Sequence, residues 1–205
     1  MKIALCGYLG KMGSSAYELL KEYYHVIGIE KNDNLENYDF DLLIDFTNFK
    51  SAYKNILYCI NKKIDFICGT TGFDNQQISF IKERCKENNI NGVICYNFSL
   101  PINFLLSNSK IIGEYFDNLN YYDFHNKNKI DKISGTNYLF KEKYPTIHTK
   151  SIQNDKKNIT YVITLQGKYD KISLTYQVNN RKAYALGLLS YLQGNKESII
   201  NILND

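Results

Sequence analysis

Short apolar runs alternate with stretches of helical periodicity along the first hundred residues. The apolar runs predict β-strands at residues 2–6, 26–30, 42–46, 66–68 and 93–96. Between the strands, apolar side chains recur every three or four residues, as at Met12, Ala16 and Leu20, which predicts amphipathic helices. Strands that alternate with helices are typical of a parallel sheet covered on both faces. We therefore expect an α/β fold with an N-terminal Rossmann-type sheet.

The pattern changes after Leu100-Pro101. Apolar periodicity predicts a helix at residues 103–115, and a strand follows at 119–124. From residue 146 to 178 the chain is rich in strand-forming residues that alternate with polar ones, and Gln166-Gly167-Lys168 is typical of a hairpin turn. Such a run of strands predicts a smaller α+β domain with a mostly antiparallel sheet. A last apolar helix face runs from Ala183 to Leu192.

Composition and charge exclude some partners. The 205 residues carry a formal net charge of +4 from scattered lysines, without a basic block, so we expect no nucleic-acid partner. Apolar runs stay well short of membrane-spanning length, so we expect no membrane partner either. Met1 leads directly into the first predicted strand, which leaves no room for a signal peptide. These features predict a cytoplasmic protein.

The cysteines favour a reducing compartment. There are five, an odd number without paired spacing, which is more typical of free thiols than of a disulfide framework. A Cys-x-x-Cys pair is absent and the three histidines lie far apart in the sequence, so we expect no metal site.

A glycine-rich turn lies between the first predicted strand and the first predicted helix, at Gly7-Tyr8-Leu9-Gly10-Lys11-Met12-Gly13. Glycines there let the backbone approach a pyrophosphate, which the N–H groups of the following helix stabilise. The spacing has one residue more than the common dinucleotide fingerprint, and a purely structural turn is the alternative. Glu30, after the second strand, suits the adenosine ribose hydroxyls, whereas Lys31 suits a 2′-phosphate. The choice between NADH and NADPH therefore stays open.

Three further polar turns follow predicted strands, at Asp45-Phe46-Thr47, Gly69-Thr70-Thr71-Gly72 and Tyr96-Asn97-Phe98-Ser99. Open parallel sheets bind ligands at the carboxyl ends of their strands. Each turn alone is also explained by an ordinary loop. Together they predict a polar sheet edge that suits a nicotinamide ring.

Candidate acid–base chemistry is concentrated between residues 125 and 136. His125 and Lys129 lie four residues apart, and Ser134-Gly135-Thr136 follows closely. An imidazole exchanges a proton near neutral pH, and a nearby lysine donates a proton or holds an anion. Hydroxyls and backbone N–H groups of the small turn suit a carboxylate, especially where a helix begins. This segment predicts chemistry on a small acidic molecule, and a polar surface loop is the alternative.

Taken in order, these motifs resemble the dihydrodipicolinate reductases of bacterial lysine and diaminopimelate biosynthesis. The combination of Gly-Thr-Thr-Gly with His125-x3-Lys129-x4-Ser134-Gly135-Thr136 carries most of the resemblance, and Arg181 with the last helix extends it. The resemblance implies an oxidoreductase that reduces 4-hydroxy-tetrahydrodipicolinate to tetrahydrodipicolinate with NADH or NADPH. It also implies a dinucleotide-binding domain of residues 1–99 and 182–205, and a substrate-binding and oligomerisation domain of residues 100–181.

The resemblance also implies roles for single residues. His125 looks like the acid/base residue and Lys129 like the proton donor. Substrate-binding residues are then Asn126, Ser134, Gly135 and Thr136. Cofactor contacts are implied for Gly7, Tyr8, Leu9, Gly10, Lys11, Met12, Glu30, Gly69, Thr70, Thr71, Cys95, Tyr96, Asn97 and Phe98.

The sequence departs from the family pattern at a few positions. Asn126 stands where relatives usually carry a second histidine, and the segment between Thr136 and Ile159 is short. We therefore expect a homo-oligomer, either a dimer or a tetramer. An alternative function is a nucleotide-binding redox sensor or regulatory protein without turnover. A semialdehyde-type dehydrogenase would need a nucleophilic cysteine, for which buried Cys95 is the nearest candidate. Arg181 either braces the domain junction or faces substrate, or is a surface charge at a helix start.

Overall fold

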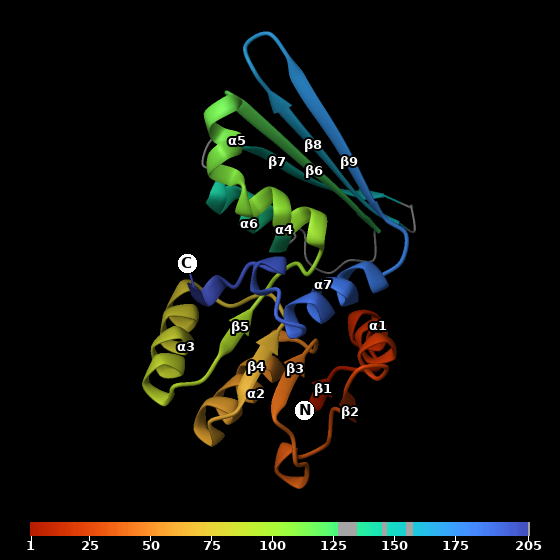
Figure 1. The fold of residues 1–205 in the computed structure, drawn as a ribbon, viewed down its shortest axis with the longest axis vertical. Coiled ribbons are helices and arrows are strands. Elements are labelled where there is room, and N and C mark those ends of the chain that lie inside the picture. Colours follow the sequence, from red (N-terminus) through yellow and green to blue (C-terminus); the bar gives the residue numbers. More distant parts are fainter. Residues whose placement is uncertain (127–134, 145–146, 155–157, 205) are drawn as a thin grey trace.

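The computed structural model describes residues 1–126, 135–144, 147–154 and 158–204, with the side chains of residues 125, 126 and 154 left outside the description. Two sheets lie one above the other along the long axis of the molecule (Figure 1). The lower sheet holds the N-terminal strands and the upper sheet holds the later ones. The predicted combination of a parallel sheet with a mostly antiparallel one is confirmed.

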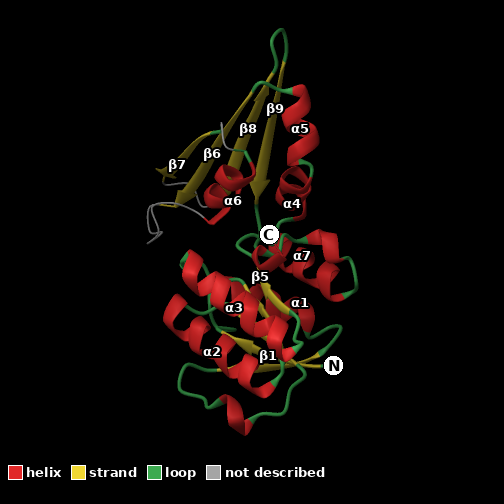
Figure 2. Ribbon diagram, turned by 90° about the vertical axis from the view of Figure 1, so that its left-hand side faces the viewer, coloured by secondary structure: helices red, strands yellow, loops and turns green. Residues whose placement is uncertain are grey.

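The lower sheet has the order β2-β1-β3-β4-β5, and all its strands run parallel. Helices α1 and α7 cover one face, and α2 and α3 cover the other (Figures 1 and 2). The strands are almost wholly apolar because both faces are buried. The elements are β1 (Lys2–Cys6), α1 (Lys11–Leu20), β2 (His25–Ile29), η1 (Leu35–Asn37), β3 (Leu42–Asp45), α2 (Phe49–Lys62), β4 (Asp65–Cys68), α3 (Asn75–Asn88) and β5 (Gly92–Ile94).

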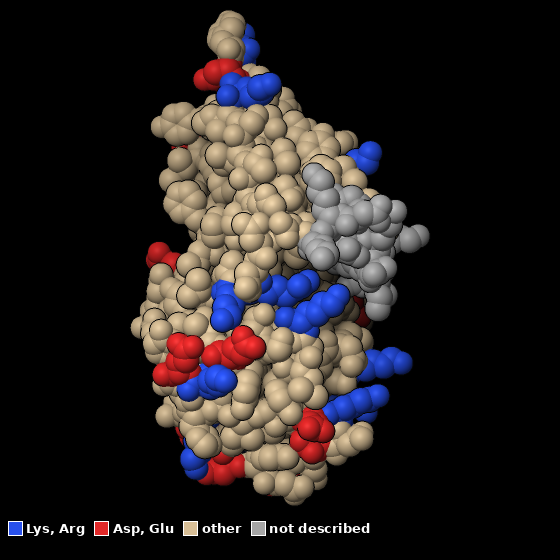
Figure 3. Space-filling view, turned by 90° about the vertical axis from the view of Figure 1, so that its right-hand side faces the viewer, with Lys and Arg blue, Asp and Glu red and all other residues tan. Residues whose placement is uncertain are grey.

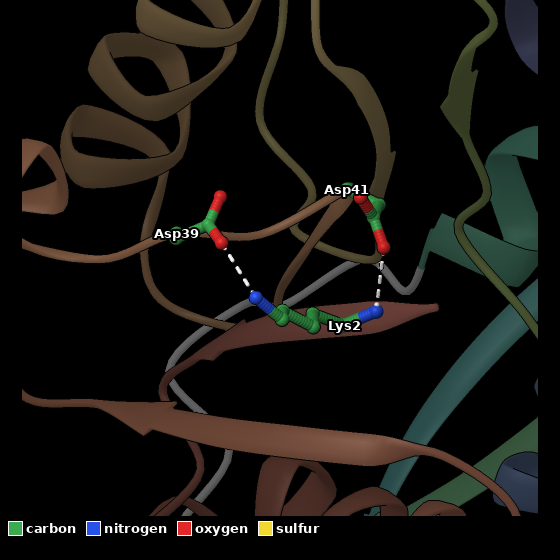
Figure 4. A network of polar contacts seen from close by, with 3 residues as sticks. All are labelled: Lys2, Asp39 and Asp41. Atoms are coloured by element: carbon green, nitrogen blue, oxygen red, sulfur yellow. Dashed lines mark hydrogen bonds and ion pairs between the residues drawn. The ribbon is translucent and has the colours of Figure 1, made fainter.

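Side-chain caps explain where the helices of this half begin. The Asn48 side chain accepts a hydrogen bond from the Ser51 backbone N–H and starts α2. Asp74 and Gln77 form a reciprocal capping box at the start of α3. At the amino end of β1, the Lys2 ammonium donates to Asp39 and the Lys2 backbone N–H donates to Asp41, both in the segment before β3 (Figure 4). The contact with Asp39 raises the pKa of Lys2 and lowers the pKa of Asp39.

The upper sheet has the order β7-β6-β8-β9. The β6–β8 and β8–β9 pairs are antiparallel and the β6–β7 pair is parallel, so the sheet is mixed. Helices α4, α5 and α6 lie on one face (Figures 1 and 2). The turn between β8 and β9 begins at Gly167, as predicted. The elements are α4 (Leu100–Ser107), α5 (Ser109–Tyr115), β6 (Asn118–Asn126), α6 (Gly135–Lys143), β7 (His148–Asn154), β8 (Ile159–Gln166) and β9 (Lys171–Val178).

The single helix expected at residues 103–115 is wrong, because the segment forms α4 and α5 with a break at Asn108. Ser99 caps the start of α4, and Pro101 occupies its first turn, where a missing N–H costs nothing. The Asn108 side chain donates to the Phe104 carbonyl at 2.8 Å, and its backbone leaves helical geometry. Asparagine side chains compete with helical hydrogen bonds in this way, so the helix ends there.

The last helix returns to the lower sheet. Helix α7 (Lys182–Leu192) packs against α1 and also contacts α4. Beyond it come η2 (Lys196–Ser198) and η3 (Ile202–Asn204). Asn201 accepts a hydrogen bond from the Ile94 N–H at 3.0 Å and donates to the Gly92 carbonyl, which fixes the C-terminal segment to β5. Seen from the side of α1 and α7, Lys and Arg side chains gather near the waist of the molecule (Figure 3).

Candidate functional site

Two neighbouring cavities lie at the carboxyl ends of the parallel strands, and Phe46 lines both of them. The larger, of about 510 Å³, opens beside the glycine-rich turn and the end of β2, and we call it the nucleotide cavity. The smaller, of about 300 Å³, lies where the lower half meets α6, β8 and the start of α7, and we call it the junction cavity. This sheet edge is where open α/β folds bind their ligands.

The glycine-rich turn has the backbone features that an anionic group needs. Gly7 has a φ of +78°, and a Cβ on it would come within 2.6 Å of the Phe46 carbonyl oxygen, so only glycine fits. Gly10 is the N-cap of α1 and supplies no side-chain cap. Gly10 therefore does not cap the N–H groups in the first turn of α1. A pyrophosphate site beside the cavity requires such uncapped N–H groups. The turn fits a dinucleotide.

The far wall of the nucleotide cavity holds charges of both signs. The Tyr8 hydroxyl donates to the Glu30 carboxylate at 3.3 Å. Desolvation raises the pKa of Tyr8, and the Glu30 carboxylate raises it further. Glu30, Lys31, Asp33 and Lys54 all line this cavity. An acid suits ribose hydroxyls and a lysine suits a 2′-phosphate, so this wall carries groups that fit NADH and groups that fit NADPH.

Asp45 holds the loops beneath both cavities together. Its carboxylate is fully buried at the end of β3. It accepts hydrogen bonds from the Thr47 backbone and hydroxyl at 2.8 and 2.7 Å, from Asn55 at 2.7 Å and from the Thr70 hydroxyl at 3.2 Å. Because buried carboxylates need such donors, Asp45 has a structural role that fixes the turns after β3 and β4 relative to each other.

The junction cavity brings the nucleotide half against the first turn of α6. A Cβ on Gly135 would lie 2.8 Å from the Thr71 methyl group and 2.9 Å from Tyr96 Cβ, so the two halves touch at this glycine. The Asn97 side-chain amide donates to the Thr136 hydroxyl at 2.7 Å, and both residues are buried. The turn after β5 and the first turn of α6 are thus joined directly, by residues 39 positions apart in sequence.

The sequence analysis missed two tyrosines of the junction cavity. Tyr161 on β8 and Tyr184 on α7 line it, and their hydroxyl oxygens lie 2.9 Å apart. The Tyr161 hydroxyl also hydrogen-bonds with the Thr136 side chain. Burial raises the pKa of both tyrosines, so both stay neutral. Their positions in sequence indicate only a strand and a helix face. Arg181 lines the same cavity.

The predicted site residues fall into four groups. Those on the nucleotide cavity are Gly7, Tyr8, Leu9, Gly10 and Glu30, and those on the junction cavity are Met12, Gly69, Thr71, Tyr96, Asn97, Phe98, Gly135 and Thr136. Lys11, Thr70 and Cys95 line neither of them. Lys11 is exposed to solvent, and the Thr70 hydroxyl donates a hydrogen bond to the Asp45 carboxylate. Cys95 is fully buried, and its thiol donates to the Asn97 carbonyl oxygen. Lys129 and Ser134 lie outside the described residues, as do the side chains of His125 and Asn126, whose backbone ends β6.

The environment of Cys95 argues against a nucleophilic cysteine in this site. Burial raises the pKa of its thiol to about 12, so the thiolate is not accessible near neutral pH. Within the described ranges, His, Cys, Asp and Glu side chains do not form a group of three that would suit a metal ion. Every helix in those ranges is too short or too polar to cross a membrane.

The fold and the two cavities define a Rossmann-type protein with a second, mixed-sheet half, of the class that includes many dehydrogenases. A family profile described as dihydrodipicolinate reductase, N-terminus, matches residues 26–98. The 4-hydroxy-tetrahydrodipicolinate reductase of Christiangramia forsetii is 32% identical, over 91% of this chain and 89% of the relative. That of Wigglesworthia glossinidia brevipalpis is 31% identical over 86% and 72%. The chain belongs to the dihydrodipicolinate reductase family.

Solved structures agree with this fold. A dipicolinate-bound dihydrodipicolinate reductase from Paenisporosarcina sp. TG-14 superposes with a TM-score of 0.78 at 17% identity, covering 94% of this chain and 93% of that one. The WlbA dehydrogenase of Thermus thermophilus, solved in complex with NAD, gives a TM-score of 0.66 at 11% identity, covering 97% and 91%. At these identities the likeness concerns the fold alone.

Proposed function

We propose that this protein reduces 4-hydroxy-tetrahydrodipicolinate to tetrahydrodipicolinate with NADH or NADPH. The observation that carries this proposal is the junction cavity, in which the turns after β4 and β5 face the first turn of α6. A nicotinamide beside Gly69, Thr71 and Tyr96 would then lie against a carboxylate held at Gly135 and Thr136. The family relationship supports the same reaction.

The division of roles follows from the chemistry of the groups. The dinucleotide, when bound, supplies the hydride, and the protein positions the substrate and supplies the matching proton. The N–H groups at the start of α6 suit one carboxylate, because a helix N-terminus attracts negative charge. We assign the proton to His125 and Lys129, with Asn126 and Ser134 beside them as further substrate contacts. Residues 1–99 with 182–205 then hold the cofactor, and residues 100–181 hold the substrate.

The reaction is tested with purified protein, enzymatically generated substrate and either NADH or NADPH, by following the loss of nicotinamide absorbance. Parallel initial rates with the two cofactors decide the preference. We expect His125→Ala and Lys129→Ala each to lower kcat by about a hundredfold or more, the usual contribution of a positioned acid–base group. Undiminished activity in both variants contradicts the assignment of roles. Tight cofactor binding without turnover or affinity for a dicarboxylate would instead favour the redox-sensor function.

A further inference from the structure

Helices α4 and α5, on the outside of the upper half, expose large apolar side chains to solvent (Figures 1 and 2). Phe104, Ile111 and Tyr115 are exposed by 66%, 55% and 75%. Their spacing of seven and four residues places them on one side of a helix. Helical backbone bonds continue through the break, because Asn108 donates to the Phe104 carbonyl and Ile112 donates to the Asn108 carbonyl. The three side chains therefore form one row, which we call the outer stripe.

The opposite side of these helices is firmly packed. Ile102 and Leu106 of α4 are buried, and Ile112 of α5 packs against the hydrophobic core. The Tyr144 hydroxyl donates to the Leu105 carbonyl at 3.0 Å and fixes α4 to the end of α6. Exposure of the outer stripe is therefore not the result of a loose segment. Apolar side chains that gather on the surface of such an anchored helix mark an interaction surface.

Two opposite charges lie beside the outer stripe. Lys110 and Glu114 are exposed and stand four residues apart on α5. Neither forms an ion pair with any residue that the structure describes. A lysine that precedes a glutamate at this spacing is the weaker arrangement for a pair within one helix. Both charges are thus available to a partner.

This pattern of charges is complementary to itself. In a two-fold symmetric contact, a residue i that meets a residue j of the partner is matched by j meeting i. Two α5 helices that pack antiparallel place Lys110 of one copy against Glu114 of the other, twice. The same operation brings Ile111 and Tyr115 against the outer stripe of the second copy. Gly113 leaves room for the approach, because nothing lies within 4 Å of a Cβ built there.

Other occupants fit this face less well. A partner without matching charges would bury Lys110 and Glu114 unpaired, which is costly. An anionic surface would attract the lysine but repel the glutamate beside it. A second copy of the chain satisfies both charges and covers the outer stripe at once.

We propose that the outer stripe, together with Lys110 and Glu114, is a two-fold interface between copies of this chain. The homo-oligomer expected from the sequence then has a defined surface, on the helical side of the upper half. This inference goes beyond the proposed function and does not depend on it, because these residues line neither the nucleotide cavity nor the junction cavity.

The test is a charge swap followed by sedimentation equilibrium, which measures the dissociation constant of the dimer. The wild type should self-associate. Glu114→Lys and Lys110→Glu each set like charges opposite each other at two places, so each should weaken the dimer by about tenfold or more. The double variant Lys110→Glu with Glu114→Lys exchanges the charges and should restore a dissociation constant close to that of the wild type. Restoration separates a paired contact from a general loss of folding.

The apolar part of the face is tested separately. Ile111→Ser combined with Tyr115→Ser should shift the chain to monomers, because it removes the apolar centre of the contact. Phe80→Ser is the matched control, since it removes an exposed aromatic side chain from α3 in the lower half and should leave the dissociation constant unchanged. Far-ultraviolet circular dichroism confirms that each variant is folded.

Three outcomes overturn the interface. The first is a wild type that stays monomeric even at submillimolar subunit concentration. The second is an oligomer that neither the single charge reversals nor the serine variant weakens, which means that another surface, such as the open face of the upper sheet, holds it together. The third is a double charge swap that stays as weak as the single reversals. Reductase assays on the same samples test the proposed function independently of all three.

Discussion

At the scale of single residues, two glycines allow close packing beside the junction cavity. Gly69 faces the rings of Phe46 and Phe98, which pack edge to face at 5.6 Å, and Gly135 faces Thr71 and Tyr96. The sequence revealed both glycines as motif residues. It did not show why glycine is needed at these two positions, because the aromatic rings that exclude a side chain come from other strands and loops.

Gly69→Ala should therefore be destabilising. Its Cβ would overlap the Phe46 ring and lie 2.8 Å from Phe98, so the rings must move, at a cost of about 1–3 kcal/mol. Urea unfolding measures the loss, and dinucleotide affinity should fall with it. Gly113→Ala in α5 is the matched control, because nothing lies within 4 Å of that position, and alanine should stabilise the helix by about 0.5–1 kcal/mol. Equal effects of the two substitutions would contradict the packing argument.

Asp45 gives a second prediction at this scale. Asp45→Asn puts an amide among the Thr47, Asn55 and Thr70 donors, so at least one buried donor loses its acceptor. We expect a loss of about 1–3 kcal/mol in the free energy of unfolding. Asp39→Asn removes the same charge from an exposed ion pair and should change the free energy of unfolding far less than Asp45→Asn does. A small effect at Asp45 would show that the loops tolerate its loss.

At the scale of elements, periodicity predicted most of the strands and helices but not every boundary. The α4–α5 break depends on one asparagine side chain, which a hydrophobic pattern does not register. The pattern predicted strands across residues 146–178, and in β8 Tyr161, Ile163 and Leu165 are buried, whereas Ile172 and Leu174 of the alternating run in β9 are exposed. It did not distinguish a tyrosine that faces a cavity from leucine and isoleucine that face helices. That distinction requires α7, whose Tyr184 lies 23 residues further along the chain.

The Tyr161–Tyr184 contact should couple β8 to α7. Tyr184→Phe removes one hydrogen bond and should cost about 0.5–1.5 kcal/mol, and Tyr161→Phe should cost more because it also loses Thr136. The double variant should lose less stability than the two single variants added together. Tyr144→Phe, which loses a bond to the Leu105 carbonyl away from the cavity, is the control and should be additive with Tyr184→Phe. Additive effects for the tyrosine pair would contradict the coupling.

At the scale of the whole molecule, the sequence predicted the two-sheet architecture and the sheet edge that carries the cavities. It did so because strand ends and glycine turns are local signals. The sequence did not predict the junction cavity, because Thr136, Tyr161 and Arg181 come together only when the two sheets and helix α7 are assembled. The acid–base roles of His125 and Lys129 come from the sequence alone and stay a prediction.

Burial of all five thiols gives a prediction for the molecule as a whole. Every cysteine is free and buried, and burial raises the pKa of Cys85 to about 11 and of Cys59 and Cys95 to about 12, from an ordinary 9.0. The folded state thus holds these protons more tightly than the unfolded state does. The associated stability is fully present below the unfolded pKa and is lost as pH rises through the folded values.

The free energy of unfolding should accordingly begin to fall above about pH 9, by at most about 1.4 kcal/mol per pH unit for each thiol. Urea titrations across this range measure the slope, and Cys85→Ala should reduce it by the share of one thiol. A colorimetric thiol reagent should react slowly with the native protein and rapidly in urea, because only the unfolded chain exposes the thiolates. Rapid reaction of all five thiols under native conditions would mean that the core opens far more readily than this burial allows.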